Sequence, residues 1–89
     1  MPEIELVINT KVGLHARPAA LFVQLAKQFA SDIRIINSGK EANAKSILSV
    51  LSLGVYHGTK ICLTAQGDDA DEALAALQEL IETNFGEPE

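Results

Sequence analysis

Glycines and turn-forming residues divide the 89-residue chain into short segments, and the spacing of the apolar residues changes from one segment to the next. The segments EIELVIN (3–9), DIRIIN (32–37) and KICLTAQ (60–66) alternate apolar and polar residues, which is typical of a strand with one buried face. Residues 16–29 and 70–84 instead repeat apolar residues every three or four positions, which predicts helices with one apolar stripe each. Such helices must cover a sheet to bury their stripes.

Two shorter segments complete the pattern. An NSGK turn is expected to lead into a short strand at 40–42. The segment SILSVLSLG (46–54) predicts a short apolar helix, with Ser46 as its N-cap and Gly54 as its stop. Asp68 is the expected cap of the last helix.

The resulting order is β-α-β-β-α-β-α, and it indicates an α+β fold with two layers, an open-faced sandwich of helices on one sheet face. Residues 1–89 are expected to form a single domain. The opposite face of the sheet is expected to be partly exposed. Cys62 and Thr64 should lie on that less buried side because they alternate with Ile61 and Leu63.

Composition and charge exclude several classes of protein. The net charge is −5: residues 10–60 hold all seven bases and only two acids, whereas residues 61–89 hold eight acids and no base. This balance argues against direct binding to nucleic acid. The single cysteine, Cys62, excludes an internal disulfide, and we interpret it as a small hydrophobic residue.

Targeting and metal signals are also missing from the sequence. No apolar run approaches the roughly 20 residues that cross a bilayer, and no N-terminal signal is visible. A metal carrier with this order of elements would need two cysteines in the loop before the first helix, and TKVGLHA has none. We therefore expect a cytoplasmic protein without membrane insertion, cofactor or metal.

The stretch KVGLHARPAA places His15 and Arg17 where the first helix is expected to begin. The first turn of a helix has unpaired N–H groups and a partial positive charge, so it suits an anion such as phosphate. That positive end favours a neutral, nucleophilic imidazole, and the Arg17 guanidinium can donate two hydrogen bonds to phosphoryl oxygens. Pro18 suits a first turn. Because the residue before a proline avoids the α region, Arg17 is expected to be distorted or to be the cap itself.

The short helix at 46–54 has too many apolar residues to bury on one face. We expect some of them to be exposed, and a clustered apolar patch usually marks a partner site. Burial on two sides is the alternative. The residues concerned are Ile47, Leu48, Val50, Leu51 and Leu53.

Two strings carry a resemblance to a known family. GLHARPAA resembles the active-site segment of HPr, the histidine-containing phosphocarrier family of the bacterial sugar phosphotransferase system. NAKSILSVLSLGV resembles the second-helix segment of that family, and the length and order of elements also agree. The resemblance implies a four-stranded antiparallel sheet with strand order 1-4-2-3 and three helices on one face.

The same resemblance implies a function and a set of site residues. His15 would be phosphorylated on Nδ1 by Enzyme I, which draws on phosphoenolpyruvate, and would donate the group to the EIIA domain of a sugar permease, without turnover of its own. Arg17 would pair with the phosphoryl oxygens, and Ala16 and Arg17 would offer backbone N–H groups. The positions that match the docking surface of the family and its rim are Ala20, Lys27, Lys45, Ile47, Leu48, Leu51 and Gly54.

Ser46 admits two interpretations. As an N-cap it is worth about 1 kcal/mol over alanine. In many Gram-positive relatives this serine is phosphorylated by an HPr kinase/phosphorylase, which would add a charge of about −2 beside the docking surface. One alternative function is therefore a corepressor that binds a catabolite-control transcription regulator through Ser46. The string NTKVGLHARP also fits a nitrogen-type regulatory phosphocarrier, and in each case we expect a monomer.

Overall fold

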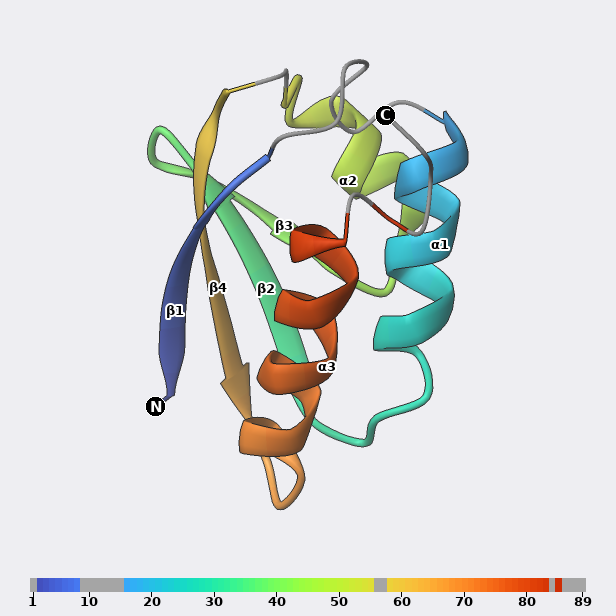
Figure 1. Ribbon diagram of the computed structural model, residues 1–89, viewed down its shortest axis with the longest axis vertical. Coiled ribbons are helices and arrows are strands. Elements are labelled where there is room, and N and C mark those ends of the chain that lie inside the picture. The colour runs from blue at the N-terminus through green and yellow to red at the C-terminus, as the bar shows by residue number, and fades with distance from the viewer. Residues whose placement is uncertain (1, 9–15, 56–57, 84, 86–89) are drawn as a thin grey trace.

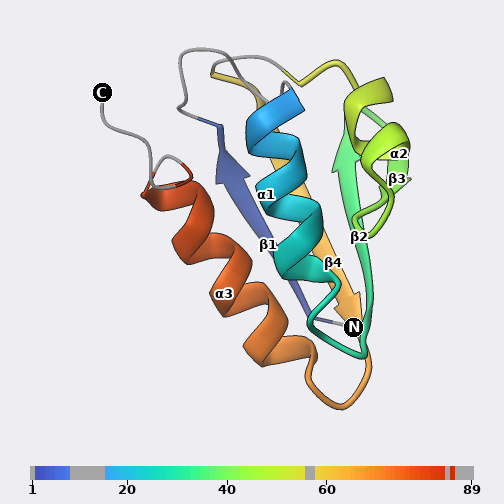
Figure 2. The ribbon, with the colours of Figure 1, turned by 90° about the vertical axis from the view of Figure 1, so that its right-hand side faces the viewer.

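The computed structural model describes residues 2–8, 16–55, 58–83 and 85. The predicted order of elements is confirmed: β1 (Glu3–Val7), α1 (Ala16–Ala26), β2 (Asp32–Asn37), β3 (Lys40–Asn43), α2 (Ile47–Ser52), β4 (Lys60–Gln66) and α3 (Ala70–Glu82). The strands form one antiparallel sheet in the order β1-β4-β2-β3. All three helices lie on one face of this sheet, as the two ribbon views show (Figures 1 and 2). The predicted fold class is therefore confirmed.

The core forms between that sheet face and the stripes of the helices. Alternate residues of the two central strands point into it, and Ile33, Ile35 and Leu63 are completely buried. Helix α1 contributes the fully buried Phe22, and α3 contributes the predicted stripe of Ala70, Ala73, Leu74, Leu77 and Ile81. Leu80 is only half-buried, and Asn84 lies outside the described residues. Helix α1 ends at Ala26, three residues before the predicted end.

The turn between β2 and β3 is a two-residue hairpin turn. Ser38 and Gly39 both have positive φ, 52° and 83°. Positive φ at both central residues matches the right-handed twist of the flanking strands, so the turn fixes the register that pairs Asn37 with Lys40. The NSGK prediction is confirmed.

The open face of the sheet differs in one respect from the expectation. Cys62 is partly exposed, as predicted, but Thr64 is 8% exposed and therefore buried. Thr64 lies on β4, directly between Glu3 on β1 and Arg34 on β2. The longer side chains of these two residues flank it. Burial, together with the Glu3 and Glu5 carboxylates, raises the pKa of the Cys62 thiol, which fits the interpretation of Cys62 as a small hydrophobic residue.

The start of α3 differs from the prediction. Asp69, not Asp68, occupies the N-cap position, and its side chain makes no capping hydrogen bond. The Asp69 carboxylate instead accepts hydrogen bonds from the Ala30 N–H (2.8 Å), the Ser31 N–H (2.9 Å) and the Ser31 hydroxyl. These bonds join the loop before β2 to the loop before α3. Gly67 allows the approach, because a Cβ there would lie 2.6 Å from Ser31 Oγ and 2.8 Å from Ser31 Cα.

We predict that Asp69→Asn lowers the free energy of unfolding near neutral pH, because an amide offers one acceptor oxygen where the carboxylate offers two. The hydrogen bond from the Ser31 hydroxyl, then that from the Ala30 N–H, lowers the pKa of Asp69. A carboxyl with a lowered folded-state pKa stabilises the fold above its unfolded pKa, about 3.9, and loses this contribution as pH falls through the folded pKa. Urea unfolding as a function of pH should therefore show the parent and Asp69→Asn converging below about pH 4.

Asp68→Asn is the matched control, because Asp68 is adjacent, carries the same charge and is exposed. Equal effects of the two substitutions at every pH would show that the Asp69 hydrogen bonds do not stabilise the fold.

Candidate functional site

Helix α1 begins at Ala16, immediately after His15 in the sequence. His15 itself, the predicted nucleophile, lies outside the described residues. Pro18 falls in the first turn of the helix, as predicted, and is buried. Arg17 is exposed and lies inside the helix, so the expectation that it caps the helix is wrong. The helix already includes Ala16, so Pro18 does not delay its start to Arg17.

The first turns of α1 and α3 differ in charge. Helix α1 has no acidic residue in its first turn, whereas α3 has Asp71 and Glu72 there. Carboxylates in a first turn offset the partial positive charge of the helix end, so the end of α3 is compensated by its own side chains. The first turn of α1 has no such compensation and therefore retains the stronger preference for an added anion.

Helix α2 begins and ends as the sequence predicted. Ser46 has extended φ and ψ values of −119° and 116°, and its hydroxyl accepts a hydrogen bond from the Ser49 N–H at 3.3 Å. Gly54 follows the helix with a φ of 65°. Ser46 is therefore an N-cap, and its side-chain oxygen satisfies one of the unpaired amide groups of the helix start.

Three apolar side chains of α2 are exposed: Ile47 (38%), Leu48 (77%) and Leu51 (37%), which we call the α2 patch. Val50 is completely buried and Leu53 is 6% exposed, so these two attach the helix to the core. The prediction that some apolar side chains of this helix are exposed is confirmed, and the alternative of burial on two sides is wrong. Helices α1 and α2 lie side by side, and α2, which carries the patch, lies toward the same end of the molecule as the first turn of α1 (Figures 1 and 2).

The other predicted docking positions are spread more widely. Ala20 on α1 is half-buried, and Gly54 is exposed at the end of α2. Lys27 is exposed just beyond the last residue of α1. An 11-residue helix is about 16 Å long, so Lys27 lies about one helix length from Ala16.

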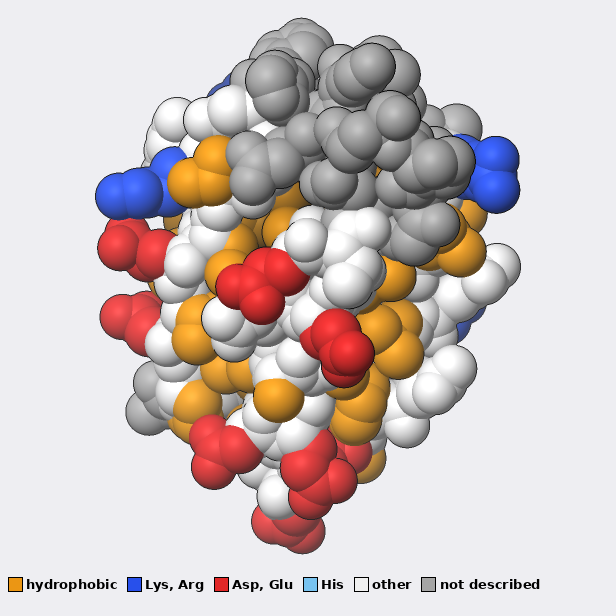
Figure 3. Space-filling model, in the orientation of Figure 1, with side chains coloured by type: hydrophobic (Ala, Val, Ile, Leu, Met, Phe, Trp, Pro, Cys, Tyr) orange, Lys and Arg blue, Asp and Glu red, His pale blue; other side chains and the backbone are white. Residues whose placement is uncertain are grey.

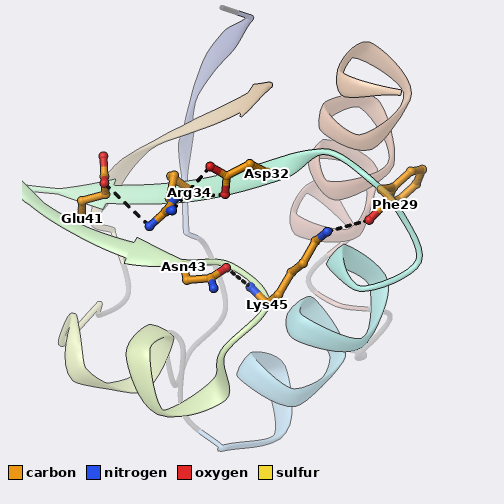
Figure 4. A network of polar contacts seen from close by, with 6 residues as sticks. All are labelled: Phe29, Asp32, Arg34, Glu41, Asn43 and Lys45. Atoms are coloured by element: carbon orange, nitrogen blue, oxygen red, sulfur yellow. Dashed lines mark hydrogen bonds and ion pairs between the residues drawn. The ribbon is translucent and has the colours of Figure 1, made fainter. Parts of the chain in front are cut away.

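Lys45 does not occupy a simple rim position. Its ammonium group donates a hydrogen bond to the Phe29 carbonyl at 2.7 Å, as Figure 4 shows, and its side chain is half-buried. Lys45 therefore contacts the loop that follows the last residue of α1. Sequence reasoning missed this role, and also missed the hydrogen bond that Asn37 Nδ2 donates to the Leu53 carbonyl at 3.3 Å. Neither bond leaves a local sequence signal, because each joins residues that are 16 positions apart.

Acidic side chains dominate another part of the surface. Figure 3 shows them along β1 and over α3, while the visible Lys and Arg side chains lie toward the edges of this view. Among the described residues, no cluster of three or more His, Cys, Asp or Glu side chains is arranged to hold a metal ion. No helix in the described part of the chain has the length and apolar character needed to cross a membrane.

Comparison with known proteins gives the family. The model of the PTS HPr component phosphorylation site matches residues 2–83. The chain belongs to the HPr family. It is 49% identical over 77 residues to the HPr-like protein Crh of Bacillus subtilis, covering 86% of this chain and 91% of Crh. It is 43% identical over 84 residues to the phosphocarrier protein HPr of Mycoplasma capricolum, covering 93% of this chain and 94% of that protein.

Solved structures agree with this assignment to the HPr family. HPr-C-His from Thermoanaerobacter tengcongensis is 52% identical, superposes with a TM-score of 0.97 and covers 100% of both chains. An HPr dimer from the same organism is 53% identical, with a TM-score of 0.79, and the match covers 98% of this chain and 100% of that one. The fold of this HPr-family chain is therefore shared along its length with phosphocarriers of the phosphotransferase system.

We predict that Leu48→Ala changes the free energy of unfolding by less than about 0.5 kcal/mol, because the side chain is exposed. Leu53→Ala is the matched comparison, since it deletes the same atoms from the buried C-cap position of the same helix and should cost about 2–5 kcal/mol. Urea unfolding measures both values. A similar loss for the two variants would show that Leu48 belongs to the core and not to a docking surface.

Proposed function

We propose that this chain is a phosphocarrier that accepts a phosphoryl group on Nδ1 of His15 from phospho-Enzyme I and donates it to the EIIA domain of a sugar permease. The observation that carries the proposal is the position of His15, immediately before a helix whose first turn contains no acidic side chain. Membership of the HPr family supports it.

The transfer step follows from the chemistry of these groups. A lone pair on the neutral imidazole forms the N–P bond, while the bond between phosphorus and the donor atom of Enzyme I breaks and its electrons stay with that atom. Phosphoryl transfer depends mainly on positioning and charge stabilisation. The Arg17 guanidinium and the N–H groups of Ala16 and Arg17 supply these for the phosphoryl oxygens. The phosphoryl group is then held on His15 until an acceptor binds.

Docking of both partners is proposed to use the α2 patch together with Ala20 and Gly54, with Lys27 as a cation at the edge. An apolar patch with a positive edge suits fast and weak encounters, which a carrier with two successive partners requires. These encounters would take place in the cytoplasm. We expect a monomer to act, although the similar structures include an HPr dimer.

The test is intact-mass measurement after incubation with phosphoenolpyruvate and Enzyme I. We predict that the parent chain gains one phosphate that acid removes, because a P–N bond is acid-labile, and that His15→Ala gains none. The Ser46→Ala variant is the control, because it removes the other proposed phosphorylation site and should still gain the phosphate. An equal mass gain for His15→Ala and the parent would contradict the proposal.

A regulatory role for Ser46 is the second candidate function. Two observations favour it: Ser46 is the N-cap of the helix that carries the α2 patch, and the chain is 49% identical to Crh, an HPr-like protein. We propose that an HPr kinase/phosphorylase phosphorylates Ser46. The helix start tolerates the phosphate, while its charge beside the patch weakens the docking of Enzyme I. The phosphorylated chain would then bind a catabolite-control transcription regulator.

We predict that Ser46→Asp slows phosphoryl uptake from Enzyme I by about 3- to 10-fold, because a negative charge next to the patch opposes an electrostatically assisted encounter. Ser46→Asn is the matched control, since asparagine caps a helix about as well as aspartate and carries no charge. Rapid-quench kinetics should show a near-parental rate for Ser46→Asn. Equal rates for Ser46→Asp and Ser46→Asn would remove the electrostatic explanation.

A further inference from the structure

Helix α2 is too short to hold its own position. It has six residues, and isolated helices shorter than about 12–15 residues are marginal in water. Val50 and Leu53 attach one side of it to the core. Leu48 is 77% exposed, so its position is set by the backbone of α2 and little by contacts of its own side chain. The placement of the α2 patch therefore depends on what fixes the two ends of the helix.

The segment just before α2 is bound to the loop that follows α1. The Lys45 ammonium donates to the Phe29 carbonyl at 2.7 Å, and the Lys45 N–H donates to the Asn43 side-chain oxygen at 2.9 Å (Figure 4). The Ser46 N–H donates to the Asn43 carbonyl at 3.0 Å. Phe29 follows Ala26, the last residue of α1, by three positions, and Lys45 precedes Ile47, the first residue of α2, by two. Lys45 therefore ties the segment before α2 to the loop that follows α1.

The far end of α2 is bound to the sheet. Leu53 is the C-cap residue of α2, and its carbonyl accepts a hydrogen bond from Asn37 Nδ2 at 3.3 Å. Asn37 is the last residue of β2. The carbonyls at the end of a helix have no partner within the helix, so this bond satisfies one of them and fixes the helix end relative to the sheet.

We propose that Lys45 and Asn37 are positioning residues that hold the α2 patch at a fixed place beside α1, so that partners meet a preformed surface. Lys45 then acts within the molecule, not as a rim cation offered to a partner, because a partner that drew its ammonium away would leave the Phe29 carbonyl without its charge-assisted bond. This inference rests on the proposed function for its kinetic consequence, although the anchoring can be measured without any partner.

Hydrogen exchange tests the anchoring directly. In Lys45→Met, which keeps the apolar stem and removes the donor, the Ser49 and Val50 amides should exchange about 10-fold faster, as loss of one charge-assisted bond implies. Amides of β4 such as that of Leu63 should keep their parental rates. Lys45→Arg should restore protection of α2, because guanidinium also donates to a carbonyl. Unchanged exchange in Lys45→Met would overturn the proposal.

Transfer kinetics distinguish positioning from charge. For phosphoryl uptake from Enzyme I, Lys45→Met should raise KM about 5-fold without changing kcat, and the ratio to the parent should persist at high salt. Lys27→Met, which removes an exposed cation, should show a KM effect that fades as salt screens it. Lys60→Met is the control for net charge, because it removes a positive charge from the open face of the sheet. At high salt, where the change in net charge is screened, Lys60→Met should have the parental KM.

The outcomes separate the two proposals. Suppose that the effect of Lys45→Met on KM fades with salt, as that of Lys27→Met does, and that the α2 amides exchange at parental rates. Lys45 would then be a rim cation, and the inference would be overturned. If the parent accepts no phosphoryl group, the proposed function fails, while the exchange measurement still decides whether the anchoring exists. Asn37→Ala serves where Lys45→Met does not fold, and it should speed the exchange of the Gly54 N–H, which donates to the Leu51 carbonyl.

Discussion

Burial of the inner face of β2 and β4 against α1 and α3 is the constraint on which the other features depend. Ile33, Ile35 and Leu63 are completely buried, and their burial leaves each covering helix one orientation in which its stripe faces the sheet. With α1 held along the sheet in this way, its first turn lies at one end of the molecule. The connection from β3 places α2 beside α1, toward the same end of the molecule as the first turn of α1.

The chain uses helix ends in three different ways. The first turn of α1 has no acidic side chain and directly follows His15 in the sequence. The start of α2 is capped by Ser46, and the start of α3 has Asp71 and Glu72. Asp69 stands at the N-cap position of α3, yet its carboxylate binds the loop before β2. Carboxylates therefore offset the partial positive charge at the start of α3, and not in the first turns of α1 and α2.

The sequence was sufficient to predict features that are set by neighbouring residues. The strands at 32–37 and 60–66 and the Ser46 cap depend on periodicity and on one residue in its immediate context, and each was predicted correctly. Three features were not predictable in this way. The Asp69 carboxylate binds Ala30 and Ser31, which are separated from it by 39 and 38 positions in the sequence. Lys45 binds Phe29 across a separation of 16 positions. The burial of Thr64 depends on which strands flank β4.

The separation of charge on the surface has a consequence for the protein in a crowded solution. Acidic side chains cover β1 and α3 in Figure 3, and the residues from Ile61 onward contain eight acids and no base. Two copies that approach each other through these faces repel each other, so these faces resist self-association. The protein can thus remain dispersed in solution while its apolar α2 patch stays exposed, because colloidal stability comes from a different part of the surface.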